Sequence, residues 1–406
     1  MQNEPVKGRW WIGVVYFAVA ATPGTWASVL ANVIKERGWE EWLALAFMVP
    51  QIAGMISPLI IGAWADRKFP AEKVLMATMA ASGVLIFAAF YALEHAASPW
   101  WFLALMMANS LAAAPTWALI TTVALGNLNG KGDNFGSFRV WGTVGWMVAG
   151  WAVSAFALDH SPKIGYLAAF WRVLGVLACL KLPKTLPRGG QMKSWRSVLG
   201  LDALVILKER DQAVYFATCF LFYLPISAFY MHTPIQLAEL GMRNVATGMT
   251  VAQVVEVGAI LLMGLVMARV RVKTMFLVAM FFGVLRFVLY AVGVSWGSTA
   301  WVLAGVALHG ICWPFFFETG KVFVDRRVDV GMRAQAQALL TLVSGGLSAL
   351  TGTFVVDALY ELIVRGGNGG WTTYWLVLTG MGGLAMLFFA LGYRGLPVPA
   401  RKKDQA

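Results

Sequence analysis

A glutamate in the middle of an apolar segment is the residue of this sequence whose position most needs a chemical explanation. The segment runs from Thr247 to Ala268, and Glu256 is its one charged residue. About 20 apolar residues are enough to cross a bilayer core, where an ionised carboxylate costs several kcal/mol unless it faces water or polar partners. Gln253 lies three residues before Glu256 and so shares its helix face. This face is a candidate for substrate binding and for proton transfer.

Two interpretations of Glu256 are compatible. As a proton-coupling group, it would exchange a proton as its surroundings alternate between open to water and closed, because protonation removes the cost of a buried charge. As a structural carboxylate, it would pair with a basic residue such as Arg139 or Arg286. A carboxylate whose partner changes during a transport cycle would do both.

A second group of polar residues follows helical spacing in the segment 138–158. Arg139, Thr143 and Trp146 stand at i, i+4 and i+7, which places them on one face of a helix. A cation, a hydroxyl and a large flat ring suit a polar ligand that carries an aromatic base, because Trp can stack on the base while Arg and Thr bond to its edges or sugar. Alternatively, Arg139 reaches the membrane interface from the start of the helix.

The segment 299–324 carries a third group. Glu318 and Lys321 are spaced i, i+3, and they either form a pair within the helix with an interfacial lysine or add a second proton-handling carboxylate at Glu318. His309 either lines a cavity between the helices and binds substrate or packs as a hydrogen-bonded core residue.

Composition identifies the medium in which these residues work. The chain has 406 residues, of which 59% are hydrophobic and 13% are charged, well above the roughly 45–50% apolar content of soluble domains. The net charge of +12 is explained by topology: if the N-terminus is cytoplasmic, 23 of the 32 Lys and Arg residues fall on that side and five outside. Arg139, Arg172, Arg286 and Lys321 fall within helices, and for Arg172 and Arg286 we expect structural pairing or an interfacial position. No nucleic-acid partner is needed to account for the charge.

Apolar runs of spanning length predict an all-α membrane protein with twelve transmembrane helices and both termini in the cytoplasm. The longest polar connection divides them into a bundle over 1–182, a linker over 183–212 and a bundle over 213–406. The linker has apolar residues at helical spacing, so it is either an interfacial amphipathic helix or a soluble one. The predicted spans are 10–33, 42–64, 73–93, 100–125, 138–158, 164–182, 213–237, 245–268, 273–293, 299–324, 334–360 and 371–393.

Several motifs resemble those of a known transporter family. The stretch Gly62–Lys73, with Asp66 and Arg67 at its centre, resembles the loop motif of the major facilitator superfamily, except that Phe69 and Pro70 replace its usual continuation. Longer segments distributed over nearly the whole chain resemble the nucleoside:proton symporter family. They read PGTW (23–26), FRVWGTVGW (138–146), WRSVLGLDAL (195–204), AQVVE (252–256) and FFFETGKVFVD (315–325).

This resemblance implies a transporter of two six-helix bundles in the bacterial inner membrane, which imports nucleosides with protons by alternating access. It implies substrate contacts from Arg139, Thr143, Gln253 and Glu256, with Trp146 and Trp313 where the family has other aromatics, and a gating latch at Asp66 and Arg67. Pro225, Ala228 and Pro314 replace polar residues of the family pattern, so another small polar solute, such as a sugar or a nucleoside-like metabolite, is the alternative substrate.

Other functional classes are disfavoured. The sequence has no nucleophile–base or metal-ligand spacing in its apolar segments and no phosphate-binding glycine loop of the Walker type. A receptor would not require Glu256, Glu318 and Lys321 within its spans. We therefore expect a transporter and not an enzyme. We expect it to act as a monomer in the lipid bilayer on a small-molecule substrate and protons, without a cofactor or a metal.

Overall fold

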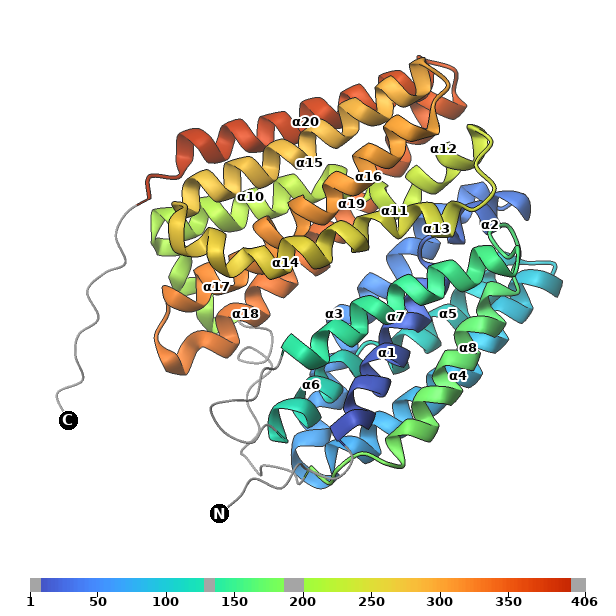
Figure 1. Cartoon of the computed structure of the whole chain (residues 1–406), viewed down its shortest axis with the longest axis vertical. Helices are drawn as coiled ribbons and strands as arrows, with labels where there is room; N and C mark the ends of the chain where they lie inside the picture. Colours follow the sequence, from blue (N-terminus) through green and yellow to red (C-terminus); the bar gives the residue numbers. More distant parts are fainter. Residues whose placement is uncertain (1–8, 128–135, 186–200, 396–406) are drawn as a thin grey trace.

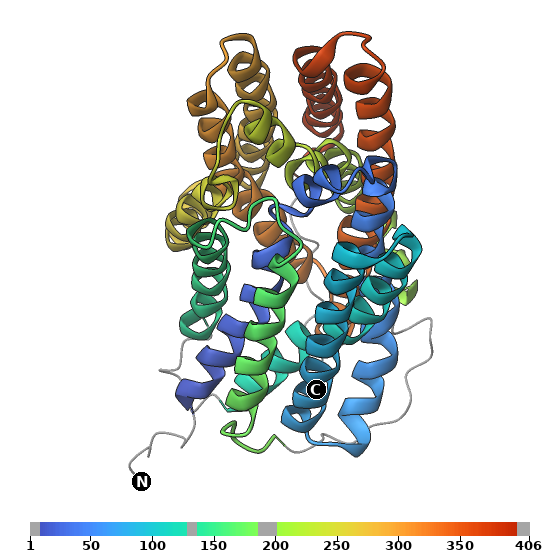
Figure 2. The same cartoon turned by 90° about the vertical axis from the view of Figure 1, so that its right-hand side faces the viewer.

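The structure is a computed structural model, and it describes residues 9–127, 136–185 and 201–395. All regular secondary structure in these ranges is helical. Figure 1 shows two groups of long helices, the N-terminal group from blue to green and the C-terminal group from yellow to red. Figure 2 shows them after a quarter turn, with the N-terminal group in the lower half and much of the C-terminal group in the upper half.

The N-terminal group is built around α1, which packs against α7, α8 and α6. Its helices are α1 (Arg9–Trp26), α2 (Leu30–Glu36), α3 (Leu43–Lys68), α4 (Ala71–His95), α5 (Pro99–Ala113), α6 (Thr116–Gly126), α7 (Gly136–Ala155) and α8 (Ile164–Cys179), with a 3-10 turn, η1 (Glu40–Trp42), before α3.

The C-terminal group has more breaks in its helices. Its elements are α10 (Arg210–Ile226), α11 (Ala228–Met231), α12 (Thr233–Glu239), α13 (Val245–Met249), α14 (Val251–Arg269), α15 (Val272–Ser295), α16 (Thr299–Trp313), η3 (Pro314–Glu318), α17 (Thr319–Arg326), η4 (Val330–Met332), α18 (Arg333–Thr341), η5 (Leu342–Leu347), α19 (Ser348–Tyr360), η6 (Glu361–Arg365) and α20 (Gly370–Gly392).

The all-helical membrane class that the sequence predicts is confirmed. Within the described residues, nine helical segments are long and apolar enough to cross a membrane. The other three predicted spans, 42–64, 138–158 and 164–182, fall on the helices α3, α7 and α8, of which α8 is a shorter apolar helix. The count of twelve spans and the side on which the termini lie stay predictions.

Breaks in the long helices occur where the backbone ladder is interrupted and locally repaired. Pro225 lies in the last turn of α10, where it cannot donate a backbone hydrogen bond, and the chain restarts as α11 after Ser227. In η3, η5 and η6 the helix widens to the π form, which often marks functional segments of a helix. Membrane helices tolerate such breaks where neighbouring groups satisfy the freed backbone.

The two groups meet at one end, which we call the closed end, and diverge toward the other, the open end (Figure 1). Three helices of the N-terminal group contact the other group: α7 packs against α13 and α14, α3 against α19 and η5, and α2 against α11 and α12. The closed end carries the 156–163 and 240–244 connections, and the open end carries the start of α1 and the end of α20.

Two sequence predictions fall wholly or partly beyond the described residues. Residues 186–200 of the linker lie outside them, and the adjoining segment Leu201–Lys208 is a 3-10 helix. Asp66 and Arg67 belong to α3, but their side chains lie outside what the structure describes. The domain boundaries, the amphipathic linker helix and the gating role of this pair therefore stay predictions.

Candidate functional site

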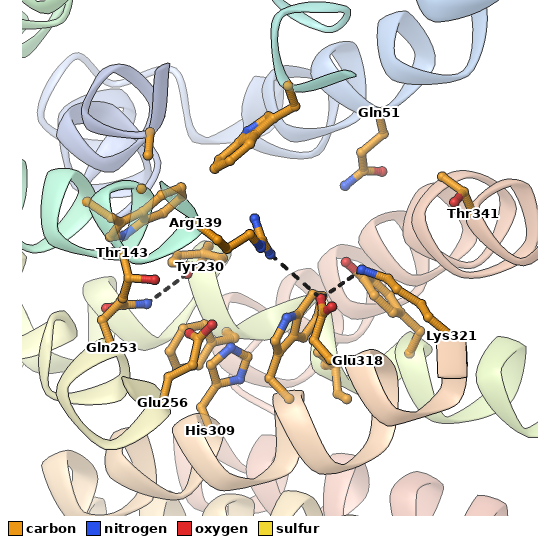
Figure 3. Close-up of a pocket in the computed structure, with 18 of the residues that line it drawn as sticks. Gln51, Arg139, Thr143, Tyr230, Gln253, Glu256, His309, Glu318, Lys321 and Thr341 are labelled. Atoms are coloured by element: carbon orange, nitrogen blue, oxygen red, sulfur yellow. Dashed lines mark hydrogen bonds and ion pairs between the residues drawn. The ribbon is translucent and has the colours of Figure 1, made fainter. Parts of the chain in front are cut away.

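A cavity of about 1020 Å³ lies between the two groups of helices, and side chains of both line it. Figure 3 shows its polar residues pointing toward one another from opposite walls. The lining includes residues of every predicted polar group: Arg139, Thr143 and Trp146 from α7, Gln253 and Glu256 from α14, His309 and Trp313 from α16, Glu318 from η3 and Lys321 from α17.

Arg139 of α7 lines the cavity. Its guanidinium carbon lies 5.3 Å above the ring of Trp117, where a cation is attracted to the ring face. Its Nη2 is 3.9 Å from the Glu318 Oε1 of the other helix group. About half of the Arg139 side chain remains exposed, so donors are still available to a ligand.

Glu318 forms the pair with Lys321 that its spacing predicts, and it also faces a cation of the other helix group. Lys321 Nζ donates a hydrogen bond of 2.7 Å to Glu318 Oε1, as expected for an i, i+3 pair. The same carboxylate faces Arg139 across the cavity, as the dashed lines in Figure 3 show. Glu318 is the last residue of the π segment that begins at Pro314. It therefore links the two groups of helices electrostatically.

Glu256 lies in the cavity wall without an ion-pair partner among the described residues, although Arg139 and Glu318 both lie within electrostatic range. The structural pairing with Arg139 or Arg286 is thus not formed in this state. Gly310 of α16 makes the local geometry possible, since a Cβ there would lie 2.2 Å from the Ala252 carbonyl oxygen and 2.7 Å from the Glu256 nitrogen. Only glycine allows α16 to pack this closely against α14 beside the carboxylate.

Gln253, one turn before Glu256, is directed at the same cavity. Its Nε2 donates a hydrogen bond of 3.4 Å to the Tyr230 hydroxyl, and its Oε1 is buried without a partner in the described part of the chain. An unsatisfied buried carbonyl oxygen is costly. A ligand donor in the cavity would offset this cost.

Aromatic side chains form the remainder of the wall. Trp146 of α7 approaches Tyr230 of α11 with ring centroids 5.8 Å apart, which joins the two helix groups. His309 stacks on Phe229 at 3.9 Å with an interplanar angle of 9°, and Trp313 lies 5.7 Å from the His309 ring. A flat ligand entering this region would meet ring faces on both sides.

The closed end is held by hydrogen bonds between the two groups. The Ala246 backbone N–H donates to Asp159 Oδ1 over 2.7 Å, and the Ser154 hydroxyl donates to the same oxygen over 3.1 Å. The Thr247 N–H donates to Ser154 Oγ at 3.1 Å. Asp159, which is 3% exposed, thus satisfies the Ala246 N–H at the start of α13 from the opposite group of helices, as a helix-capping carboxylate does.

Further contacts reinforce this end. Trp151 Nε1 donates to Thr250 Oγ1 over 3.0 Å, and Gln51 Nε2 donates to Thr353 Oγ1 over 3.1 Å. Ion pairs cross the same boundary nearer the surface, between Lys35 and Glu239 at 2.5 Å and between Arg365 and Glu40 at 3.5 Å. These polar contacts accompany a buried apolar cluster to which both groups contribute, for example Leu30 and Val33 from one and Ile235 from the other. Polar and apolar contacts together seal the cavity at the closed end.

Sequence reasoning identified the charged members of the site but missed several others. Gln51, Tyr230 and Thr353 line the cavity, and an amide at position 51 of an apolar span was the available signal. Nothing in the sequence distinguishes Trp117 from the other tryptophans. Pro225, Ala228 and Pro314 do not line the cavity, whereas Ser227 and Tyr230 do.

Comparison with known proteins identifies the family of the chain. The sequence profile described as Nucleoside H+ symporter matches residues 11–396. A putative nucleoside transporter of Escherichia coli (strain K12), YegT, is 29% identical over 91% of this chain and 88% of its own length. A xanthosine permease of the same organism is 29% identical over 96% of both chains.

Solved structures support the same fold. The crystal structure of a single-site variant of the nucleoside transporter NupG aligns with a TM-score of 0.87, with 23% sequence identity, over 95% of this chain and all of that one. The named relatives are transporters, and a multi-pass position in the bacterial inner membrane agrees with them and with the apolar helices. The chain belongs to the nucleoside H+ symporter family, as the sequence motifs predicted.

Proposed function

We propose that this protein imports a nucleoside together with a proton by alternating access, and that Glu256 couples the two. The observation that carries the proposal is a carboxylate without an ion-pair partner among the described residues, in a cavity that both groups of helices line. An intramembrane carboxylate of this kind is expected to serve transport or proton transfer. Family membership supports the substrate and the ion.

The orientation follows from charge. Basic residues concentrate on the side of the termini, and positive charge favours the cytoplasm. On this basis there are twelve spans with cytoplasmic termini, the open end faces the cytoplasm and the closed end faces outward. The structure then represents an inward-facing state, ready to release substrate and proton.

In the substrate-binding role, the aromatic wall holds the base and the polar groups hold its edges and the ribose. Trp146 and Trp313 offer ring faces, while Arg139 and Thr143 supply donors. Gln253 lines the same cavity and is a further polar contact. The size of the cavity, about 1020 Å³, accommodates a nucleoside with water.

In the coupling role, Glu256 receives a proton when the outward-facing cavity fills and loses it on the cytoplasmic side. Arg139 lies within electrostatic range of both Glu256 and Glu318 and directly faces Glu318. A shift of Arg139 toward Glu256 would favour proton release, because a nearby cation stabilises the ionised form. Glu318 therefore acts as the alternative partner of Arg139 and as the second candidate for proton handling.

Uptake by the purified protein in proteoliposomes tests the proposal. With an inward proton gradient, a radiolabelled nucleoside should accumulate above its outside concentration, and a protonophore should abolish accumulation. Uptake that ignores the gradient would contradict symport. Competition by sugars but not by any nucleoside would favour the alternative substrate class.

A further inference from the structure

A buried arginine behind the cavity wall determines which hydrogen bonds the cavity residue His309 can form. Arg286 on α15 is fully buried, and its Nη1 lies 2.6 Å from Nδ1 of His309 on α16. A guanidinium has N–H donors and no acceptor, so Nδ1 must accept this hydrogen bond. The neutral His309 ring then carries its proton on Nε2.

The arrangement holds the ring rigidly in this form. Phe229 stacks on His309 and also lies under the Arg286 guanidinium, whose central carbon is 5.5 Å from the Phe229 centroid. Phe287 contacts the same guanidinium at 4.6 Å. A proton on Nδ1 would face an N–H of Arg286 directly. His309 therefore presents a hydrogen-bond donor to the cavity and cannot present an acceptor there.

The Nε2 atom is the free edge of the ring. No described residue bonds to it, and it is not among the enclosed unpaired atoms, so it faces the cavity that His309 lines. Figure 3 shows the ring beside Glu256 in the cavity wall. The surrounding wall is aromatic, with Trp313 5.7 Å away and Phe229 stacked on the ring. This donor is therefore placed to form a hydrogen bond with the flat base of a ligand.

The charge of Arg286 also strengthens Nε2–H of His309 as a hydrogen-bond donor. In the described part of the chain no acidic side chain pairs with Arg286, and its Nε and Nη2 are buried without partners. A positive charge behind the ring polarises Nε2–H and makes it a better donor, since buried hydrogen bonds in a chain reinforce one another. Such a donor favours a carbonyl oxygen and disfavours an amino group.

We propose that His309, positioned by Arg286, makes the cavity selective for nucleosides whose base carries a carbonyl oxygen where an amino group would otherwise stand. Inosine should be preferred over adenosine, and uridine over cytidine, because each pair differs in this way at one exocyclic group, together with the proton on the adjacent ring nitrogen. The inference rests on the proposed nucleoside transport and adds the feature of the base that the site reads.

Proton-driven uptake of the four nucleosides by the full-length protein in proteoliposomes tests the inference. The wild type should have a KM about tenfold lower for inosine than for adenosine, with the same direction for uridine over cytidine, since an amino group would leave the donor unpaired. Equal KM values in both pairs would overturn the inference while leaving nucleoside transport intact. Failure to transport any of the four would contradict the proposed function, and the inference with it.

Variants distinguish recognition of the base by His309 and Arg286 from a purely structural role of these residues. Arg286→Met frees the His309 proton to move to Nδ1, and His309→Phe keeps the stacking but removes the donor, so both should reduce the inosine preference to about one. Arg286→Lys, which also only donates, should restore it. Arg172→Met removes the buried arginine of α8, outside the cavity lining, and should retain the preference. If Arg286→Met lowers the amount of folded protein, His309→Phe decides: an unchanged KM ratio in that variant would overturn the inference.

Discussion

Arg139 is placed to interact with two carboxylates that belong to the opposite group of helices. It faces Glu318 at 3.9 Å and acts electrostatically on Glu256. Because these acids lie on η3 and α14 while Arg139 lies on α7, any rocking of the groups changes both distances. At the scale of single residues, coupling between proton and substrate thus depends on which carboxylate Arg139 approaches.

Replacing Arg139 by Gln should raise the KM for nucleoside by roughly 10-fold to 100-fold, because a hydrogen bond from a charged donor contributes about 1.5–3 kcal/mol. Initial uptake rates over a range of nucleoside concentrations measure the effect. Lys321→Ala is the matched control: Lys321 also contacts Glu318, but half of its side chain is exposed, so its loss should change the KM by less than about fivefold. A larger effect for Lys321→Ala than for Arg139→Gln would contradict the assignment.

The charged residues of the site could be predicted from the sequence, but their partners could not. A charge in an apolar run has a cost that points to function, which identified Arg139, Glu256 and Glu318. Arg286 carried the same signal, yet its contact with His309 joins positions 286 and 309 of different helices. Such contacts depend on how the helices pack, and spacing within one segment carries no information about that packing.

At the scale of elements, the start of α13 is capped from the opposite group of helices. Asp159 and Ser154, which flank the end of α7, accept N–H bonds from Ala246 and Thr247. Burial raises the pKa of the Asp159 carboxyl, and the hydrogen bonds from Ala246 and Ser154 and the neighbouring charge of His160 only partly oppose this. His160 in turn pairs with Glu36 at 3.2 Å.

Closure of this end should therefore depend on pH. When the end opens, water reaches Asp159 and its pKa returns toward its ordinary value of about 3.9. The closed state holds the proton more tightly, so closure should weaken as pH rises from that ordinary value through the raised pKa. Spin-label distances across the closed end measure the populations at each pH.

Asp159→Asn should remove this pH dependence, since the amide oxygen still accepts the Ala246 hydrogen bond but does not titrate. Glu41→Gln changes an exposed acid at the same end and should leave it in place. An unchanged pH profile in Asp159→Asn would show that another group controls closure.

Close packing of α7 against α13 and α14 gives a second prediction for this end. A Cβ on Gly150 would lie 2.6 Å from Thr250 Cγ2 and 3.1 Å from the Ala246 carbonyl oxygen. Gly150→Leu should hold the end open, because overpacking of this kind costs about 1–3 kcal/mol. Uptake should fall at least about tenfold, while nucleoside binding from the outer side persists.

Gly264→Leu is the control for this substitution. Gly264 lies on α14, and a Cβ at this position would have no atom of another described element within 4 Å. Transport by this variant should therefore continue at close to the wild-type rate. Normal uptake by Gly150→Leu would mean that α7 does not need to approach α13 during the cycle.

The helices were predictable from the sequence as apolar runs, but their interruptions were not. Pro225 was compatible with either a continuous or a broken helix, and the chain breaks at Ser227. The π segments contain no distinctive residue pattern, except that Pro314 begins one of them. A backbone group can leave the helical hydrogen-bond pattern only where neighbouring groups in space satisfy it. These breaks therefore follow from tertiary packing.

At the scale of the whole molecule, the two groups of helices line a polar cavity and contact each other at its closed end in the part of the chain that the structure describes. The contacts of the closed end include hydrogen bonds and ion pairs, such as those of Asp159 and Lys35, beside a buried apolar cluster that both groups share, with members such as Val33 and Ile235. Away from that end, each group has an apolar core of its own. Two groups that each have their own core and that contact each other at one end suit a rocking motion that moves access from one side to the other.

The membrane class and the transporter family could be predicted from the sequence because hydrocarbon imposes long apolar helices and because motifs recur along nearly the whole chain. The conformational state of the molecule could not be predicted from the sequence, because the same residues must support both the open and the closed arrangement of each end. Contacts between the groups, such as that of Gln51 with Thr353, belong to the state described here, and the spacing of residues along the chain does not say which state is populated.

Paired measurement of proton and nucleoside influx in the same proteoliposomes tests the coupling role of Glu256 most directly. The wild type should move protons inward with nucleoside. Glu256→Gln should exchange labelled for unlabelled nucleoside across the membrane but neither accumulate it nor carry protons, because the amide retains hydrogen bonding and cannot ionise. Proton-driven accumulation by Glu256→Gln at the wild-type level would contradict the account.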